Sequence, residues 1–202
     1  MADRLNLSLW FPSFREAEMM PRMLSVLRQF PFSATRPGIG FIAVHAVNWN
    51  EPLVFQQTFD FRADSERVIG LASEFLHSDY AYEFEALWDL WAPEIEGDLD
   101  ARWVLQPHQV RLLAHGVDFD QGTYQQNGHI QIEFGLDTPF LHEEMELDEV
   151  SEARVKTNVK KLVDFTSAVE KNCGISGRLL WSDSEEAENL AQKLISRLQR
   201  VQ

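Results

Sequence analysis

Apolar and polar residues alternate at the start of the chain, and the spacing then becomes helical. An apolar side chain stands at every second position of residues 5–11, which predicts a strand with one buried face. Ser13 and Glu16 have the spacing of a capping box, so we expect a helix to begin there. Pro21 either kinks this helix or forms its first turn, because proline removes a hydrogen-bond donor at later helical positions. The apolar stripe of the helix consists of Ala17, Met20, Leu24 and Leu27.

The next apolar stretches predict a hairpin followed by a second helix. Residues 38–47 are apolar at both sets of alternating positions, which is typical of a strand covered on both faces. Residues 48–52 indicate a turn, and residues 53–61 return as a second strand. Asp64 can cap a helix whose apolar residues lie along one face.

Residues 80–91 alternate between an aromatic face and an acidic face, which predicts a long strand. Residues 5–91 therefore follow the order β-α-β-β-α-β, which is the order of a ferredoxin-like unit. The second half predicts the order β-β-β-α-β-α. Its elements are strands near 103–106, 108–119 and 128–136, a helix from Asp148 to Gly174, a strand at 175–181, and a last helix opened by a Ser182–Glu185 capping box.

These patterns predict an α+β fold with an antiparallel or mixed sheet and helices packed mainly on one face. Residues 1–95 and 101–202 would form two α+β halves packed as one compact unit. The shared order of elements also suggests a finer hypothesis, that two ferredoxin-like units make a pseudo-duplicate.

Acidic and basic residues are unevenly distributed along the chain. The chain has 202 residues with 18 Lys and Arg against 32 Asp and Glu, a net charge of −14. Residues 64–100 hold eleven acids and one base, and residues 137–152 hold seven acids and no base. A field of this sign repels phosphate backbones and anionic lipid and attracts cations, so neither nucleic acid nor a membrane is an expected partner.

The chain also gives signals about its compartment. The amino-terminal residues lack the charged region and apolar run of a signal peptide, and no stretch approaches the length of a membrane span. The single cysteine, Cys173, cannot form an intrachain disulfide, which favours a reducing environment. A cytoplasmic location is therefore expected.

Motifs for common chemistry are missing from the sequence. Neither GxGxxG nor GxxxxGK[ST] is present, and the spacing of a nucleophile elbow is lacking. Cys173 lies near a predicted helix end, where the dipole disfavours a thiolate, so we interpret it as structural. No cofactor is expected.

Two sets of residues have side chains that could bind a metal ion. The run from His142 to Glu146 lacks the histidine pair of HExxH and is interpreted as the solvated approach to a helix. His45, His115 and His129 all lie on predicted strands and could converge, although histidines satisfied by core hydrogen bonds are the simpler interpretation.

Acidic and tryptophan side chains mark one candidate surface. Glu83, Glu85 and Asp89 lie on the polar side of the alternating strand, which we interpret as a solvated face, and Trp91 falls on the same side. Trp10 shares a predicted face with Asn6 and Ser8. An exposed tryptophan beside carboxylates suits a cationic group or a partner surface.

Two functions follow as hypotheses. The first is a non-catalytic binding module that uses this acidic, Trp-containing face against a basic protein partner, with self-association through a sheet edge as a variant. The second is a small-ligand or metal-dependent enzyme, with a pocket between the halves where a strand histidine meets a carboxylate. Whether the protein is an enzyme is left open by the sequence.

Overall fold

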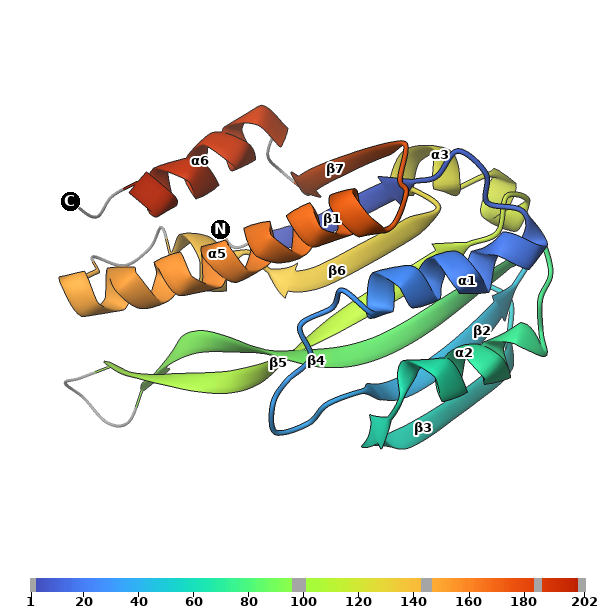
Figure 1. Ribbon diagram of the computed structural model, residues 1–202, viewed down its shortest axis with the longest axis horizontal. Helices are drawn as coiled ribbons and strands as arrows, with labels where there is room; N and C mark the ends of the chain where they lie inside the picture. Colours follow the sequence, from blue (N-terminus) through green and yellow to red (C-terminus); the bar gives the residue numbers. More distant parts are fainter. Residues whose placement is uncertain (1–2, 96–100, 143–146, 184–186, 200–202) are drawn as a thin grey trace.

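The computed structural model describes residues 3–95, 101–142, 147–183 and 187–199, and within them the fold is α+β. Seven strands form one open antiparallel sheet, accompanied by six α-helices and a short 3-10 turn at Phe119–Gln121 (Figure 1). The elements are β1 (Arg4–Trp10), α1 (Glu16–Leu27), β2 (Ile39–Ala46), β3 (Leu53–Ala63), α2 (Ser65–Ser73), β4 (Tyr80–Ile95), β5 (Ala101–His115), α3 (Tyr124–Asn127), β6 (Ile130–Leu136), α4 (Thr138–Leu141), α5 (Glu149–Asn172), β7 (Gly177–Ser182) and α6 (Ala187–Gln199).

The strand order is β3-β2-β4-β5-β6-β1-β7, and every neighbouring pair is antiparallel. A ferredoxin-like unit confined to residues 5–91 would keep β1 among its own strands. Instead, β1 pairs with β6 and β7, which come from the second half of the chain. The topology therefore does not confirm two ferredoxin-like units.

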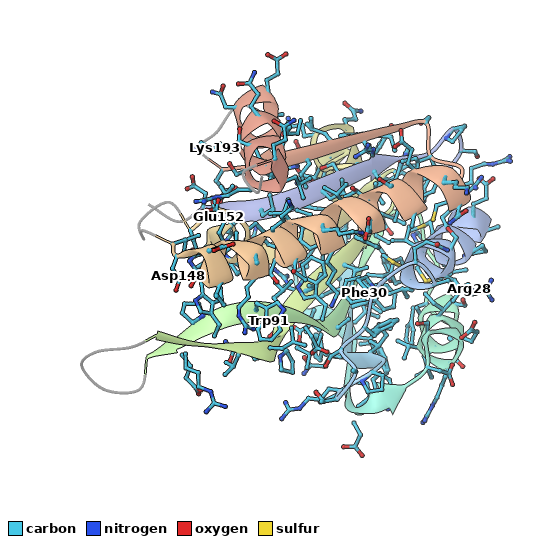
Figure 2. The ribbon with its side chains drawn as sticks, turned by 60° about the vertical axis from the view of Figure 1, so that its left-hand side comes forward. Arg28, Phe30, Trp91, Asp148, Glu152 and Lys193 are labelled. Atoms are coloured by element: carbon cyan, nitrogen blue, oxygen red, sulfur yellow. The ribbon has the colours of Figure 1, made fainter. Side chains whose placement is uncertain are left out.

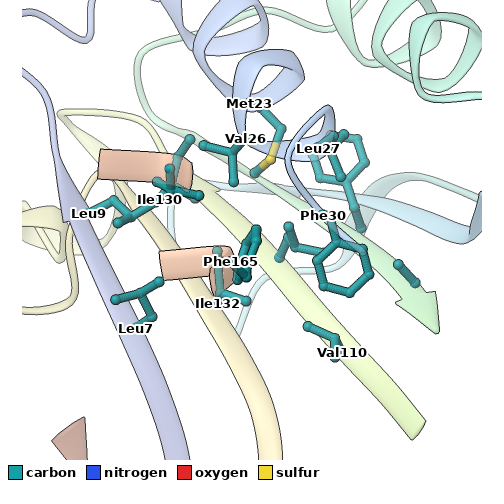
Figure 3. Close-up of a cluster of buried hydrophobic side chains, with 14 of the residues drawn as sticks. Leu7, Leu9, Met23, Val26, Leu27, Phe30, Val110, Ile130, Ile132 and Phe165 are labelled. Carbon is teal, nitrogen blue, oxygen red and sulfur yellow. The ribbon is translucent and has the colours of Figure 1, made fainter. Parts of the chain in front are cut away.

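Helices α1, α2 and α5 lie on one face of the sheet, and the core fills the space between (Figure 1). The alternating leucines of β1 point into this layer, and so does Trp88 of β4, which is fully buried. Figure 3 shows part of this cluster of buried side chains. The labelled members are Leu7, Leu9, Met23, Val26, Leu27, Phe30, Val110, Ile130, Ile132 and Phe165.

Several local predictions are confirmed because they depend on short-range hydrogen bonds. Asp64 caps α2 by accepting from the backbone N–H of Arg67, and Asp148 caps α5 by accepting from that of Ser151. Gly174 follows the end of α5 with a φ of 64°, a left-handed conformation that glycine adopts without a Cβ clash.

Other local predictions are wrong. Arg15, not Ser13, is the N-cap of α1, and the capping box is closed by Glu18. Pro21 lies inside α1, so of its two predicted alternatives only the first-turn position is wrong. The Glu143–Glu146 part of the acidic run and Glu185 of the last capping box lie outside the described residues.

Strand β5 is continuous where the sequence predicts two strands broken near Pro107. Pro107 pairs with Asp89 of β4, while β6 begins to pair with β5 only at Arg111. The other edge of β5 is therefore free around Pro107, and proline is tolerated at such an edge because no neighbouring strand needs its missing N–H. Within the described residues, no helix is long and apolar enough to cross a membrane.

The β4–β5 hairpin extends as an arm beyond the other strands (Figure 1). Strand β4 pairs with β2 only as far as Ala86, so its later residues have a free edge on that side. This edge is closed by side chains of α5 and by the α1–β2 connection, whose Ser33 N–H donates to the Leu87 carbonyl over 2.7 Å. The position of α5 against the arm is thus fixed by backbone groups that no strand satisfies.

Candidate functional site

Four ionisable side chains form a hydrogen-bonded chain across the sheet face opposite the helices. His45 Nε2 lies 3.1 Å from Glu83 Oε2, and Arg111 Nε donates to Glu83 Oε1 over 2.8 Å. The same arginine donates through Nη1 to Glu133 Oε2 over 2.7 Å. One of these residues comes from each of the adjacent strands β2, β4, β5 and β6. The antiparallel register of these strands brings the four side chains next to one another.

Glu83 is buried, with a relative exposure of 8%, so the expectation of a solvated side chain is wrong. Alternation along β4 predicts the correct face for Glu83. On that face, however, the side chains of His45 and Arg111 form hydrogen bonds to its carboxylate. Burial raises the pKa of this carboxyl, and the hydrogen bonds from His45 and Arg111 more than offset that effect and hold the pKa at about 2. Glu83 is therefore ionised near neutral pH.

Glu85 lies on the same face and is half-buried. Burial raises its pKa, and the neighbouring negative charge of Glu83 raises it further. Its cross-strand neighbour Arg111 already serves both Glu83 and Glu133. Among the described side chains of this face, the three carboxylates Glu83, Glu85 and Glu133 therefore have one arginine, Arg111, near them, which leaves an excess of negative charge.

Uncharged polar side chains continue this line of hydrogen-bonded residues across the sheet toward β7. Asn6 and Ser8 of β1 and Gln131 of β6 are all buried. Gln131 Nε2 donates to Asn6 Oδ1 over 3.4 Å, and the indole N–H of Trp181 donates to Ser8 Oγ over 2.9 Å. The sheet face is thus ordered by side-chain hydrogen bonds.

An aromatic cluster caps one end of this face. The ring of Trp49 lies edge-on to the rings of His45 at 4.7 Å, Phe119 at 5.0 Å and His115 at 5.9 Å, measured between centroids. Val47, just before it, has a φ of 65°, an unusual conformation for a β-branched residue. Its carbonyl accepts a hydrogen bond from Asp120, so the two loops that hold the cluster are joined.

His115 is fully buried in this cluster, and its Nδ1 lies 2.9 Å from the Gly128 carbonyl oxygen. Because a carbonyl only accepts, Nδ1 carries the proton. Burial lowers the pKa of His115 to about 4, so the ring is neutral near pH 7. Its Nε2 has no hydrogen-bond partner among the described residues.

His129 has separate partners. Its Nδ1 accepts from the Phe11 N–H over 3.0 Å, and its ring stacks on those of Tyr124 and Phe14. Among the described residues, no group of three or more His, Cys, Asp or Glu side chains is placed to hold a metal ion. The structure therefore does not gather His45, His115 and His129 into one metal centre.

The other predicted surface residues lie apart from Glu83 and Glu85. The indole N–H of Trp10 donates to the Tyr124 carbonyl, at the end of the sheet. Asp89 and Trp91 lie on β4 within the arm, and Figure 2 labels Trp91 there. The guanidinium carbon of Arg154 of α5 lies 3.8 Å from the centre of the Trp91 ring. Alternation along β4 places Glu83, Glu85, Asp89 and Trp91 on one face, but the twist of the long hairpin brings Trp91 against α5.

Sequence reasoning missed Arg111 and Glu133, which complete the hydrogen-bonded chain. Both stand on predicted strands between apolar neighbours, so a polar side chain facing away from the core could have been inferred for each. Their contact with Glu83 could not, because it depends on which strands are neighbours and in what register.

Comparisons of the chain with protein-family models, with curated proteins and with solved structures gave no significant match. The functional argument therefore rests on the geometry alone. Within the described residues, the sheet face around Glu83 is an ordered surface on which carboxylates outnumber basic side chains.

Proposed function

We propose that the protein is a non-catalytic binding module that engages a basic protein partner through the sheet face around Glu83 and Glu85. The observation that carries the proposal is the shortage of cations among the described side chains of that face, where Arg111 is the neighbour of Glu83, Glu85 and Glu133. A lysine or arginine of a partner would supply the missing charge next to Glu85. The acidic balance of the whole chain would speed the encounter.

The electrostatic state of Glu85 supports this proposal. Its raised pKa reflects burial first and then the repulsion from Glu83. A cation that docks beside it would favour the ionised form and lower that pKa. Glu83 already accepts hydrogen bonds from His45 and Arg111, whereas Glu85 is hydrogen-bonded to the neutral Gln109, so Glu85 is the carboxylate better able to receive a cation.

We expect Glu85→Gln to weaken binding of poly-L-lysine about five- to tenfold at low salt, because one carboxylate contact of about 1 kcal/mol or more is lost. Binding of the unaltered protein should also weaken as ionic strength rises. Isothermal titration calorimetry at two salt concentrations measures both effects. Glu94→Gln is the matched control, since it removes the same charge from an exposed position on the same strand.

The two variants separate a local site from a general effect of net charge. Equal weakening by Glu85→Gln and Glu94→Gln would contradict the assignment to the sheet face. Binding that does not respond to salt would contradict the electrostatic basis of the proposal. Glu83 is left unchanged in this test, because its replacement would also alter stability.

Self-association is a variant of the same proposal, since β3 is an edge strand of the sheet. Its first residues, Leu53 and Val54, are exposed. An unpaired edge can template pairing with a second copy. Light scattering across a range of protein concentrations tests this variant, and a constant monomer mass would dismiss it.

Catalysis by His45 is the second candidate, and the 3.1 Å contact between His45 and Glu83 favours it. A carboxylate that orients an imidazole is a common arrangement for a general base. A panel of hydrolase substrates, assayed with the unaltered protein and with His45→Gln, tests this candidate. Turnover that His45→Gln abolishes would replace the binding proposal, and a lack of turnover across the panel would leave it in place.

A further inference from the structure

A hollow of about 510 Å³ lies between the β4–β5 arm and helix α5, apart from the hydrogen-bonded chain on the sheet face. Its volume falls within the range of about 300–1,000 Å³ that is typical of small-molecule sites. The lining residues that matter for its chemistry are Asp89, Trp91, Leu105, Asn158, Lys161 and Phe165. Figure 2 shows Trp91 on the arm, beneath α5.

The hollow is held open by hydrogen bonds between α5 and the free edge of β4. Asn158 Oδ1 accepts from the Trp91 N–H over 2.9 Å, and Asn158 Nδ2 donates to the Trp91 carbonyl over 2.8 Å. Lys161 Nζ donates to the Asp89 carbonyl over 2.8 Å. These contacts fix the distance between helix and strand, so a ligand would enter a preformed space.

An acid and a base face this hollow with unused hydrogen-bonding capacity. Asp89 Oδ2 accepts from the Ala34 N–H over 2.8 Å, whereas Asp89 Oδ1 is shielded from solvent and has no partner among the described residues. The Lys161 ammonium carries three donors, and a single hydrogen bond, to the Asp89 carbonyl, is found for it. The two charged groups form no ion pair with one another, although both are described and both line the hollow. A bridging molecule could bond to each.

The charges around the hollow are balanced. Its lining contains two acids, Asp89 and Asp164, and two bases, Lys160 and Lys161. Lys160 and Asp164 already pair with one another at the exposed rim. An anion would be repelled by Asp89 and a cation by Lys161, so a ligand with one charge of each sign fits best.

The remaining walls are apolar. Leu105 is 53% exposed, Phe165 is buried at the back, and the Trp91 indole is half-buried. Such a surface would stabilise an apolar group of the ligand by removing it from water. We propose that the hollow binds a small zwitterion with an apolar side chain, of the class of a hydrophobic α-amino acid. Its ammonium group would bond to Asp89, its carboxylate to Lys161, and its side chain would pack on Trp91, Leu105 and Phe165.

L-Phenylalanine is the probe, with 3-phenylpropionate and phenethylamine as matched compounds that each lack one of its charges. We expect ligand-observed NMR titrations to give a saturable L-phenylalanine signal, and each matched compound to bind about tenfold more weakly or worse, because one charged hydrogen bond is lost. Equal binding of the three compounds, or no binding of L-phenylalanine, would overturn the proposal.

Two variants locate the site. Asp89→Asn keeps an oxygen for Ala34 but removes the charge, and Lys161→Met keeps the length of the side chain. Each should weaken L-phenylalanine binding about tenfold, whereas Lys156→Met, on the same helix but outside the hollow, should not. Unchanged affinity in both site variants would refute the assignment, and urea unfolding checks that each variant is folded. Glu85→Gln should leave this binding intact, which makes the result independent of the proposed partner surface.

Discussion

Asn158→Ala is expected to lower the free energy of unfolding by about 3 kcal/mol, because it leaves several backbone groups without partners. Asn158 is buried in the middle of α5, with a relative exposure of 2%. Its side chain makes three hydrogen bonds, two with the backbone of Trp91 and one with the Pro139 carbonyl. Each hydrogen bond contributes about 1 kcal/mol net, and unsatisfied buried groups add a desolvation cost.

Thr157→Ala is the matched control for this prediction. Thr157 is the preceding residue of α5, is exposed, and donates only to the Ala153 carbonyl of its own helix. Its replacement should change stability by no more than about 0.5 kcal/mol. Urea unfolding followed by circular dichroism measures both variants. A similar loss of stability in Asn158→Ala and Thr157→Ala would mean that the hydrogen bonds between α5 and β4 do not stabilise the fold as inferred.

Acidification is expected to remove about 3 kcal/mol of stability through Glu83 alone. The pKa of this carboxyl is about 2 in the folded protein, against an ordinary value of 4.5. Because the folded pKa is the lower one, the contribution is fully present above about pH 4.5 and is lost as pH falls toward 2. Each pKa unit corresponds to about 1.4 kcal/mol, which gives the expected size.

The comparison of the unaltered protein with Glu83→Gln isolates this effect from the other carboxyl groups. The difference in unfolding free energy between the two proteins should be larger at pH 7 than near pH 2, by the amount above. Glu94→Gln, at an exposed position of the same strand, should give a difference that changes little with pH. A pH-independent difference for Glu83→Gln would show that the hydrogen bonds from His45 and Arg111 do not stabilise the ionised form.

Much of the fold follows from periodicities that a single stretch of sequence carries. The alternation in residues 5–11 predicts β1 and its buried leucines, and the acidic–aromatic alternation predicts most of β4. The caps at Asp64 and Asp148 are also local, since each bonds to an N–H three residues away. Such features depend on neighbours in the chain, so they can be inferred without knowing the fold.

The candidate site was only half predictable for the same reason. Glu83, Glu85 and His45 were named from their strand positions, and the structure brings Glu83 and His45 into contact. Alternation groups Asp89 and Trp91 with them, but here β4 extends beyond β2. The Trp91 ring lies against Arg154 of α5, and the Asp89 carboxylate accepts from the Ala34 N–H. Alternation gives the face of a flat strand, and it cannot give the twist of a long hairpin.

By itself, the sequence determined the α+β class, the positions of most strands and helices, and the excess of negative charge. The tertiary structure alone decided that β1 joins β6 and β7, that Arg111 lies between Glu83 and Glu133, and that α5 closes the free edge of β4. The reason is physical. Secondary structure reflects local spacing of side chains, whereas strand neighbours and register reflect the burial of the whole chain, which joins residues far apart in sequence.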